Sequence, residues 1–320
     1  MTPDDSAMDW LLDSDPAIRW QVLRDVTDAP TAAVAAERSR VATEGWGARL
    51  LAAQTPDGGW GGTTPGDRWR FDLYTLHLLA ELGPDPAAPA VRRAIERTRD
   101  GVTWGPEFGD SPFFEGEEEP CINGRVLLIG ATFGEISESL IQRLLGEQLD
   151  DGGWNCDAPL SRRSSFHTTI CVLEGLLAAE MALGQRPDLL AARRRGEDYL
   201  LERRLLRRRR TGEIIDPSWL RFAFPSRSDF DLLRGLDYFQ STGDAPDPRL
   251  DEALAFLRER RDAAGRWALD NPELGYQHVD MGCVAGQSSR WITLRARRVL
   301  RWADQGGDSR SPGASVRPSH

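Results

Sequence analysis

Apolar positions recur at three- and four-residue spacing in segment after segment of this chain. The pattern is clear in residues 136–147 (ISESLIQRLLGE) and 251–260 (DEALAFLRER). It returns in longer segments at residues 71–83, 122–134, 166–180, 229–240 and 290–302. This spacing places apolar side chains on one face of an α-helix. The alternation of β-branched residues that is typical of strands is nearly absent, so the pattern predicts an all-α fold.

A short turn that ends in tryptophan lies between the helical segments. Two copies match well: QTPDGGW, which ends at Trp60, and QLDDGGW, which ends at Trp154. RDAAGRW, ending at Trp267, is a weaker copy, and RDGVTW at Trp104 and RTGEIIDPSW at Trp219 are fainter. The turns recur about every 50 residues, which is the scale of a repeat built from a helix pair. The sequence therefore predicts a series of helix hairpins preceded by one or two further helices.

This arrangement of turns resembles the QW repeats of the terpenoid cyclase and protein prenyltransferase superfamily, and in particular a bacterial squalene-cyclase-like member. The resemblance extends over roughly residues 45 to 302. It implies an α/α toroid, a closed barrel of about five to six helix hairpins in which inner helices line a central cavity. The alternative from the repeat alone is an open helical solenoid.

Composition and charge narrow the function classes. The chain has 320 residues and a formal net charge of −10, and a surface of that sign disfavours nucleic acid as a partner. No unbroken apolar run approaches the roughly 18 residues of a membrane span. Four sparse cysteines and an acidic start without a signal-peptide pattern lead us to expect a cytoplasmic protein. We expect one domain over residues 1–304 and a disordered C-terminal tail over 305–320.

In a toroid, we expect the pocket near the N-terminal ends of the inner helices, where unpaired backbone N–H groups collect. Polar and aromatic residues at those ends are the candidates for substrate contact and catalysis. The substrate-binding candidates are Trp69, Tyr74, Asn123, Phe166 and Trp291. The candidates for acid, base or orienting roles are Asp72, Asp231 and Arg290.

A candidate zinc site follows from the resemblance to prenyltransferase β subunits, whose ligands are an Asp and a Cys two residues apart, followed by a His on an inner helix. Here Glu119 and Cys121 have that spacing before one inner helix, and His167 begins the next. Cys156 lies on the loop between them, as a fourth ligand or a neighbour. Thiolate, imidazole and carboxylate are zinc ligands, and a catalytic zinc keeps one position open. The alternatives are a buried apolar cysteine, a solvated acidic loop and a histidine in a helix cap.

The resemblance implies an enzyme, of cyclase or transferase type, that acts on a small hydrophobic, isoprenoid-like substrate with the aid of zinc. A diphosphate substrate is disfavoured by the acidic residues at 115–119. A metal-independent cyclase is the second hypothesis, with Asp231 as the acid in SDFDLL; the alternative for this motif is that Asp229 caps the start of the helix. If zinc performs the chemistry, we expect Asp231 to be ionised and paired with an arginine. A toroid that binds a ligand without turnover is the third hypothesis.

Overall fold

The computed structural model describes residues 3–61, 68–227, 229–273, 275–276 and 278–308. The described chain is almost entirely helical, and its regular elements follow in this order: α1 (Pro3–Leu12), α2 (Pro16–Asp25), α3 (Thr31–Ser39), α4 (Gly45–Ala52), α5 (Arg68–Leu82), α6 (Pro89–Gly101), α7 (Pro120–Phe133), α8 (Glu138–Gly146), α9 (Phe166–Leu183), α10 (Pro187–Leu201), β1 (Ala223–Phe224), α11 (Leu232–Ser241), α12 (Asp251–Glu259), β2 (Asn271–Pro272) and α13 (Arg290–Asp308). The two strands are short and pair in parallel. The predicted all-α class is confirmed.

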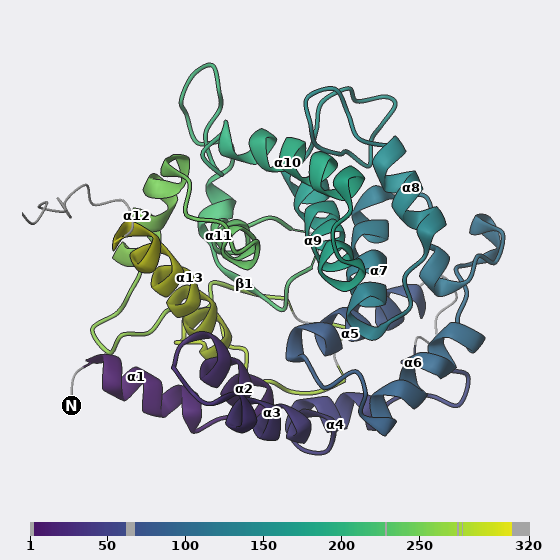
Figure 1. Ribbon diagram of the computed structural model, residues 1–320, viewed down its shortest axis with the longest axis horizontal. Helices are drawn as coiled ribbons and strands as arrows, with labels where there is room; N and C mark the ends of the chain where they lie inside the picture. Colours follow the sequence, from purple (N-terminus) through teal and green to yellow (C-terminus); the bar gives the residue numbers. More distant parts are fainter. Residues whose placement is uncertain (1–2, 62–67, 228, 274, 277, 309–320) are drawn as a thin grey trace, which may run out of the picture.

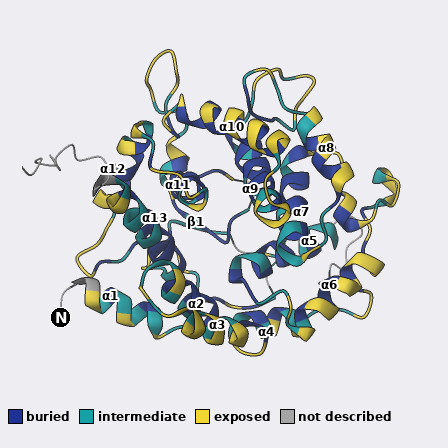
Figure 2. Cartoon of the chain, viewed as in Figure 1, coloured by how far each residue is buried: buried dark blue, intermediate teal, exposed yellow. Residues whose placement is uncertain are grey.

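The helices form two concentric layers around one centre. Figure 1 shows α5, α7, α9, α11 and α13 toward the middle, with α4, α6, α8, α10 and α12 outside them. Each outer helix precedes its inner partner in the chain, which is the order that the sequence predicts. The buried positions face the space between the layers, and the exposed positions cover the outer helices (Figure 2). The architecture is therefore an α/α toroid rather than an open solenoid.

The leading helix α2 lies between the first and last inner helices. The indole N–H of Trp20 donates to the carbonyl of Leu82 at 2.9 Å, and the side-chain amide of Gln21 donates to the carbonyl of Glu81 at 2.9 Å. On the other side, the Arg298 guanidinium of α13 donates to the side-chain oxygen of Gln21 at 3.3 Å. One leading helix thus belongs to the ring.

Two glycines let α7 and α9 approach each other backbone to backbone. A Cβ at Gly175 would lie 2.2 Å from the carbonyl oxygen of Gly124, and a Cβ at Gly124 would lie 2.4 Å from the carbonyl oxygen of Cys171. Real Cβ atoms do not approach an oxygen so closely, so these positions require glycine. The contact fixes the starts of the two helices, where the metal-ligand candidates lie.

The tryptophan turns share one hydrogen-bond pattern. The indole N–H of the tryptophan donates to a carbonyl ten residues earlier, at the end of the outer helix: Trp60 to Leu50 at 2.7 Å, Trp154 to Leu144 at 2.7 Å and Trp267 to Leu257 at 2.8 Å. All three rings are buried. Trp60 and Trp154 therefore lie buried at turns between an outer and an inner helix, and the position of these turns between helices, which the sequence predicts, is confirmed.

The glutamine of the two close copies bridges neighbouring repeats. The Gln54 side chain donates to the carbonyls of Gly58 and Ala94, and the Gln148 side chain donates to those of Gly152 and Ala192. The carbonyls at Ala94 and Ala192 belong to the next outer helices, α6 and α10. Each glutamine therefore connects its own turn to the following outer helix.

The two faint copies have a different geometry. The indole N–H of Trp104 donates forward, to the carbonyl of Phe113 at 3.0 Å. Trp219 belongs to a short 3-10 helix, Pro217–Leu220. These two tryptophans fill the core without repeating the outer-to-inner turn.

The end of the folded region lies beyond the predicted boundary. Helix α13 continues to Asp308, so residues 305–308, which the sequence assigns to the tail, belong to this helix. The rest of the predicted tail lies outside the described residues. By length and composition, α9 is apolar enough to cross a membrane, and most of it is buried inside the ring.

Candidate metal centre and ring cavity

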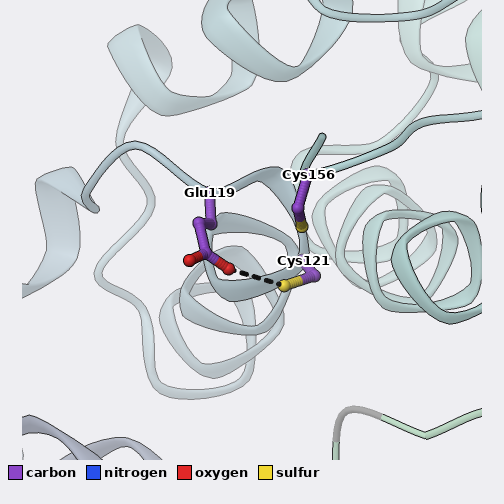
Figure 3. A group of neighbouring side chains, drawn as sticks. All are labelled: Glu119, Cys121 and Cys156. Carbon is purple, nitrogen blue, oxygen red and sulfur yellow. Dashed lines mark hydrogen bonds between the residues drawn. The ribbon is translucent and has the colours of Figure 1, made fainter. Parts of the chain in front are cut away.

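Three of the predicted zinc ligands lie together at the start of α7. Glu119 is the residue before the first turn, Cys121 lies in that turn, and Cys156 approaches from the loop between α8 and α9 (Figure 3). One ligand atom from each side chain lies within 4.8 Å of the others. The Cys121 thiol donates to a Glu119 carboxylate oxygen at 3.5 Å. In a tetrahedral zinc site, a sulfur ligand atom and an oxygen ligand atom lie roughly 3.5 Å apart.

Hydrogen bonds from the flanking elements hold these residues in place. The backbone N–H of Cys156 donates to the hydroxyl of Thr168 on α9, and its sulfur lies 3.4 Å from the same oxygen. Before α7, the Glu117 carboxylate accepts from the backbone N–H of Glu119 at 2.8 Å. The cluster is thus supported from both helices that the glycine contact joins.

The two thiols differ in acidity. The hydrogen bond from Cys121 lowers the pKa of Cys156, and the same contact, together with burial, raises the pKa of Cys121. Of the two thiols, Cys156 is therefore the more acidic. Glu119 is exposed and both cysteines are half-buried, so solvent ions reach the site.

His167 does not join this cluster. Its Nδ1 accepts from the backbone N–H of Phe230 at 2.9 Å and lies 3.5 Å from the carboxylate of Asp229. Its ring packs against Trp219 with centroids 5.9 Å apart. Burial lowers the pKa of His167, which favours the neutral ring that accepts the Phe230 amide. The helix start predicted for His167 is present, but its imidazole joins α9 to the segment before α11.

Asp72 supports a turn instead of lining a pocket. Its carboxylate is fully buried and accepts from the backbone N–H of Trp60 at 2.6 Å. Burial raises the pKa of Asp72, and the Trp60 amide opposes that rise. Thr169 and Thr293 accept from Trp154 and Trp267 in the equivalent places. Asp72 therefore holds the tryptophan turn of its repeat in the same way as the two threonines hold theirs.

Asp231 is the N-cap of α11, in place of the expected Asp229. One carboxylate oxygen accepts from the backbone N–H of Arg234 at 2.9 Å and the other from that of Ala223 at 3.2 Å. Burial raises the pKa of Asp231 to about 6. Its hydrogen-bond partners in the described chain are these amides, which differs from the expected pairing with an arginine.

Arg290 faces α1, away from the centre of the ring. Its guanidinium donates to the carbonyls of Trp10 and Asp13, at 3.2 and 3.1 Å, and lies 4.7 Å from the centroid of the Trp10 ring. The catalytic role expected from the sequence does not fit this position. The side chain instead attaches the N-terminal helix to α13.

Three of the predicted substrate contacts are core residues. Trp291 is buried and stacks on Phe224 with centroids 4.7 Å apart. Phe166 is buried against Trp219, with centroids 4.5 Å apart. The Asn123 side chain is fully buried and bonds both the N–H and the carbonyl of the Glu117 backbone. Because these three side chains are buried, they offer no surface to a substrate.

Trp69 and Tyr74 are half-buried. The Trp69 ring lies 6.1 Å from Trp104. The Tyr74 ring lies 5.7 Å from Tyr276, and the Arg227 guanidinium lies 4.9 Å from its centroid. Trp69 and Tyr74 both lie on α5, which contacts α7.

A cavity of about 720 Å³ opens at the other end of the ring. It is lined by the C-terminal parts of α5, α7 and α9 and by residues of α11 and α13, with α2 and α3 at one side. The expectation of a pocket near the helix N-termini does not describe this cavity. Its charged residues are spaced through otherwise apolar helices, which is the signal that sequence reasoning missed: Glu81, Glu174, Arg234, Asp237, Arg295 and Arg298.

Beneath this cavity, the centre of the ring is polar. His77 is buried, and both burial and the positive charges of Arg125, Arg234 and Arg295 lower its pKa well below the usual range. The sulfur of Cys171, also buried, lies 3.2 Å from the Arg125 guanidinium and 3.5 Å from that of Arg234. His77 and Cys171 are thus both buried residues with guanidinium groups around them.

No family model and no curated protein matches this chain. Solved structures that are similar to it include those of type II terpene cyclase MstE from Scytonema. The structure with the product merosterolic acid A shares 15% identity, with a TM-score of 0.49 over 95% of this chain and 96% of that one. The structure with the substrate geranylgeranyl dihydroxybenzoate shares 15% identity, with a TM-score of 0.46 over 95% and 96%. The apo structure shares 16% identity, with a TM-score of 0.46 over 95% and 97%.

Proposed function

We propose that this protein is a zinc-dependent enzyme that acts on a small hydrophobic, isoprenoid-like molecule, with the metal held by Glu119, Cys121 and Cys156. The observation that carries the proposal is the convergence of these three ligand atoms within 4.8 Å from two separate segments. Two thiolates and a carboxylate suit zinc, and three protein ligands leave a fourth position for water or substrate. When bound, zinc supplies Lewis-acid polarisation or lowers the pKa of a bound water or thiol.

The surroundings favour a neutral substrate. The exposed Glu118 lies beside the ligands, and its negative charge opposes a diphosphate close to the metal. On the neighbouring helix, the half-buried rings of Phe71 and Tyr74 offer apolar surface. We therefore expect an uncharged isoprenoid rather than its diphosphate.

The metal-independent alternative, protonation by Asp231, has less support. Burial raises the pKa of Asp231 to about 6, which favours the protonated form that a proton donor needs, but both of its carboxylate oxygens accept backbone N–H groups, which stabilise the ionised form. A toroid that binds a ligand without turnover is separated from the proposed enzyme only by a measurement of turnover.

The test begins with the metal itself. Protein purified without chelator is expected to carry close to one zinc per chain by mass spectrometry, and Cys121→Ser and Cys156→Ser to lose it while keeping a helical spectrum. In the cobalt-substituted protein, added imidazole is expected to shift the visible bands, because the fourth position exchanges. Zinc-free wild-type protein would overturn the metal site, and cobalt bands that do not respond would make it structural.

Turnover is then measured on a defined probe. Zinc-loaded protein and its Cys121→Ser variant are incubated with geranylgeraniol and, separately, with geranylgeranyl diphosphate, and products are followed by mass spectrometry. We expect conversion of the neutral alcohol by the loaded protein alone. Equal conversion by the Cys121→Ser variant would exclude the zinc mechanism.

A further inference from the structure

We infer that the 720 Å³ cavity at the C-terminal ends of α5, α7 and α9 is a second binding site, which takes a monoanionic amphiphile such as a medium-chain carboxylate. The site is separate from the metal ligands. Cys121 lies in the first turn of α7, whereas Thr132 at the end of the same helix lines the cavity. Eleven residues of α-helix separate them by roughly 16 Å.

One wall of the cavity is apolar. It comes from α7 and α9 and contains Leu128, Ala131, Leu177, Ala178, Met181 and Ala182. Met181 is 74% exposed at the end of this wall, which makes it an apolar lip open to solvent. A hydrocarbon chain laid along such a wall is removed from water, which is favourable in proportion to the apolar area buried. The volume falls within the range of about 300–1,000 Å³ that small-molecule sites occupy.

The opposite wall is charged but mostly neutralised within itself. Arg234 pairs with Glu174 at 2.6 Å, Arg295 pairs with Glu81, and Arg298 pairs with Asp237. These pairs fix the side chains of α5, α9, α11 and α13 around the cavity. They leave little net charge for a ligand to neutralise.

The remaining charge lies at Arg38, beside Trp20. Its guanidinium donates to the carbonyls of Gly83 and Pro84, at 2.9 and 3.2 Å, and forms no ion pair among the described residues. It lies 4.9 Å from the centroid of the Trp20 ring, which also lines the cavity. Burial lowers the pKa of Arg38 without bringing it near neutrality, because guanidinium groups stay protonated. Arg24, the other cation of this rim, is already paired with Asp25 at 2.5 Å.

This charge pattern selects the ligand class. The Asp85 carboxylate attracts Arg38 without forming a salt bridge with it, so this guanidinium can still bind a single negative charge, and a planar carboxylate matches its geometry. The lining residues carry five guanidinium groups and three carboxylates, an excess of positive charge that disfavours cationic ligands. A monocarboxylate with an alkyl body satisfies the Arg38 side and the apolar wall together.

Calorimetric titration of the wild-type protein tests the site with decanoate, decanol and decyltrimethylammonium, each below its micelle concentration. We expect decanoate to bind at least about tenfold more tightly than decanol, the effect of one charge-assisted hydrogen bond, and the ammonium ion to bind least. Prior removal of zinc with a chelator is expected to leave decanoate binding unchanged. Equal affinity for decanoate and decanol would overturn the assignment of the anionic head.

Variants test the two walls separately. Arg38→Ala is expected to reduce the preference for decanoate over decanol, while Arg40→Ala, which removes an exposed guanidinium outside the cavity, is expected to preserve it. Ala178→Phe fills the apolar wall and is expected to weaken both ligands at least about tenfold. Should Arg38→Ala fail to fold, Ala178→Phe and Arg38→Lys still decide the matter. Unchanged decanoate binding in a folded Ala178→Phe variant would refute the site.

Discussion

The indole N–H of Trp154 donates to the carbonyl of Leu144 at 2.7 Å, which joins the inner side of a turn to the last residues of the preceding outer helix. The ring is fully buried. The bond satisfies a carbonyl in the last turn of α8 that the helix itself leaves without a partner. Each such turn therefore depends on one side chain for both packing and helix termination.

We expect Trp154→Ala to lower the free energy of unfolding by about 3–5 kcal/mol, the range for truncation of a large buried aromatic side chain. Trp154→Phe keeps much of the packing but loses the donor, so a smaller loss is expected. Trp302→Phe is the matched control, because its indole bonds the Asp244 carbonyl at an exposed position. Denaturant unfolding measures all three, and equal stability of Trp154→Ala and the Trp302 control would refute the role of the turn.

The contact between α7 and α9 predicts a strong effect from one added methyl group. Gly175→Ala places a Cβ 2.2 Å from the Gly124 carbonyl oxygen, so the helices must separate. Overpacking of this kind costs about 1–3 kcal/mol or more. At Gly146 nothing lies within 4 Å of an added Cβ, and Gly146→Ala is expected to be neutral or to stabilise α8 by up to about 1 kcal/mol. Thermal melts of the two variants that move in the same direction would contradict the packing argument.

Residue patterns predict the layered helices and the tryptophan turns because both depend on local spacing. Glu119 and Cys121 are also found locally, since they are two residues apart. The predicted ligand His167 does not join them, because its orientation depends on the segment at 229–230, which only the folded ring brings to it. The ion pairs of the cavity join helices that are distant in sequence, such as Glu174 with Arg234. Their pairing cannot be read from either helix alone.

The placement of His167 gives a prediction that separates it from the metal ligands. His167→Ala is expected to retain zinc at the wild-type stoichiometry, because the imidazole bonds the Phe230 amide instead of the cluster. Cys156→Ser is expected to lose zinc. The lost hydrogen bond to Phe230 lowers stability by about 1 kcal/mol or somewhat more. The zinc content per chain is measured after gel filtration. Loss of zinc from His167→Ala would show that His167 is a zinc ligand.

The buried cap of α11 predicts how stability changes with pH. Burial raises the pKa of Asp231 to about 6, whereas an aspartate in the unfolded chain titrates near pH 3.9. Between about pH 4 and 6 the folded state therefore binds more protons than the unfolded state at this residue. The stabilising contribution of the group is complete below about pH 4 and is lost as pH rises to about 6. A difference of roughly two pH units corresponds to about 3 kcal/mol.

Asp231→Ser and Asp231→Asn remove this titration while keeping an oxygen that accepts from the Arg234 amide, since serine and asparagine are good N-cap residues. Denaturant unfolding is measured from pH 4 to 7. The wild type loses the contribution of Asp231 as the pH rises, and the variants do not. The free energy of unfolding of each variant minus that of the wild type is therefore expected to increase with pH. The amide of Ala223 loses its acceptor in the serine variant, which lowers stability by the same amount at every pH and leaves the slope unaffected. A difference that stays constant from pH 4 to 6 in both variants would mean that Asp231 titrates in the folded protein as it does in the unfolded chain, and that its burial does not disfavour the carboxylate.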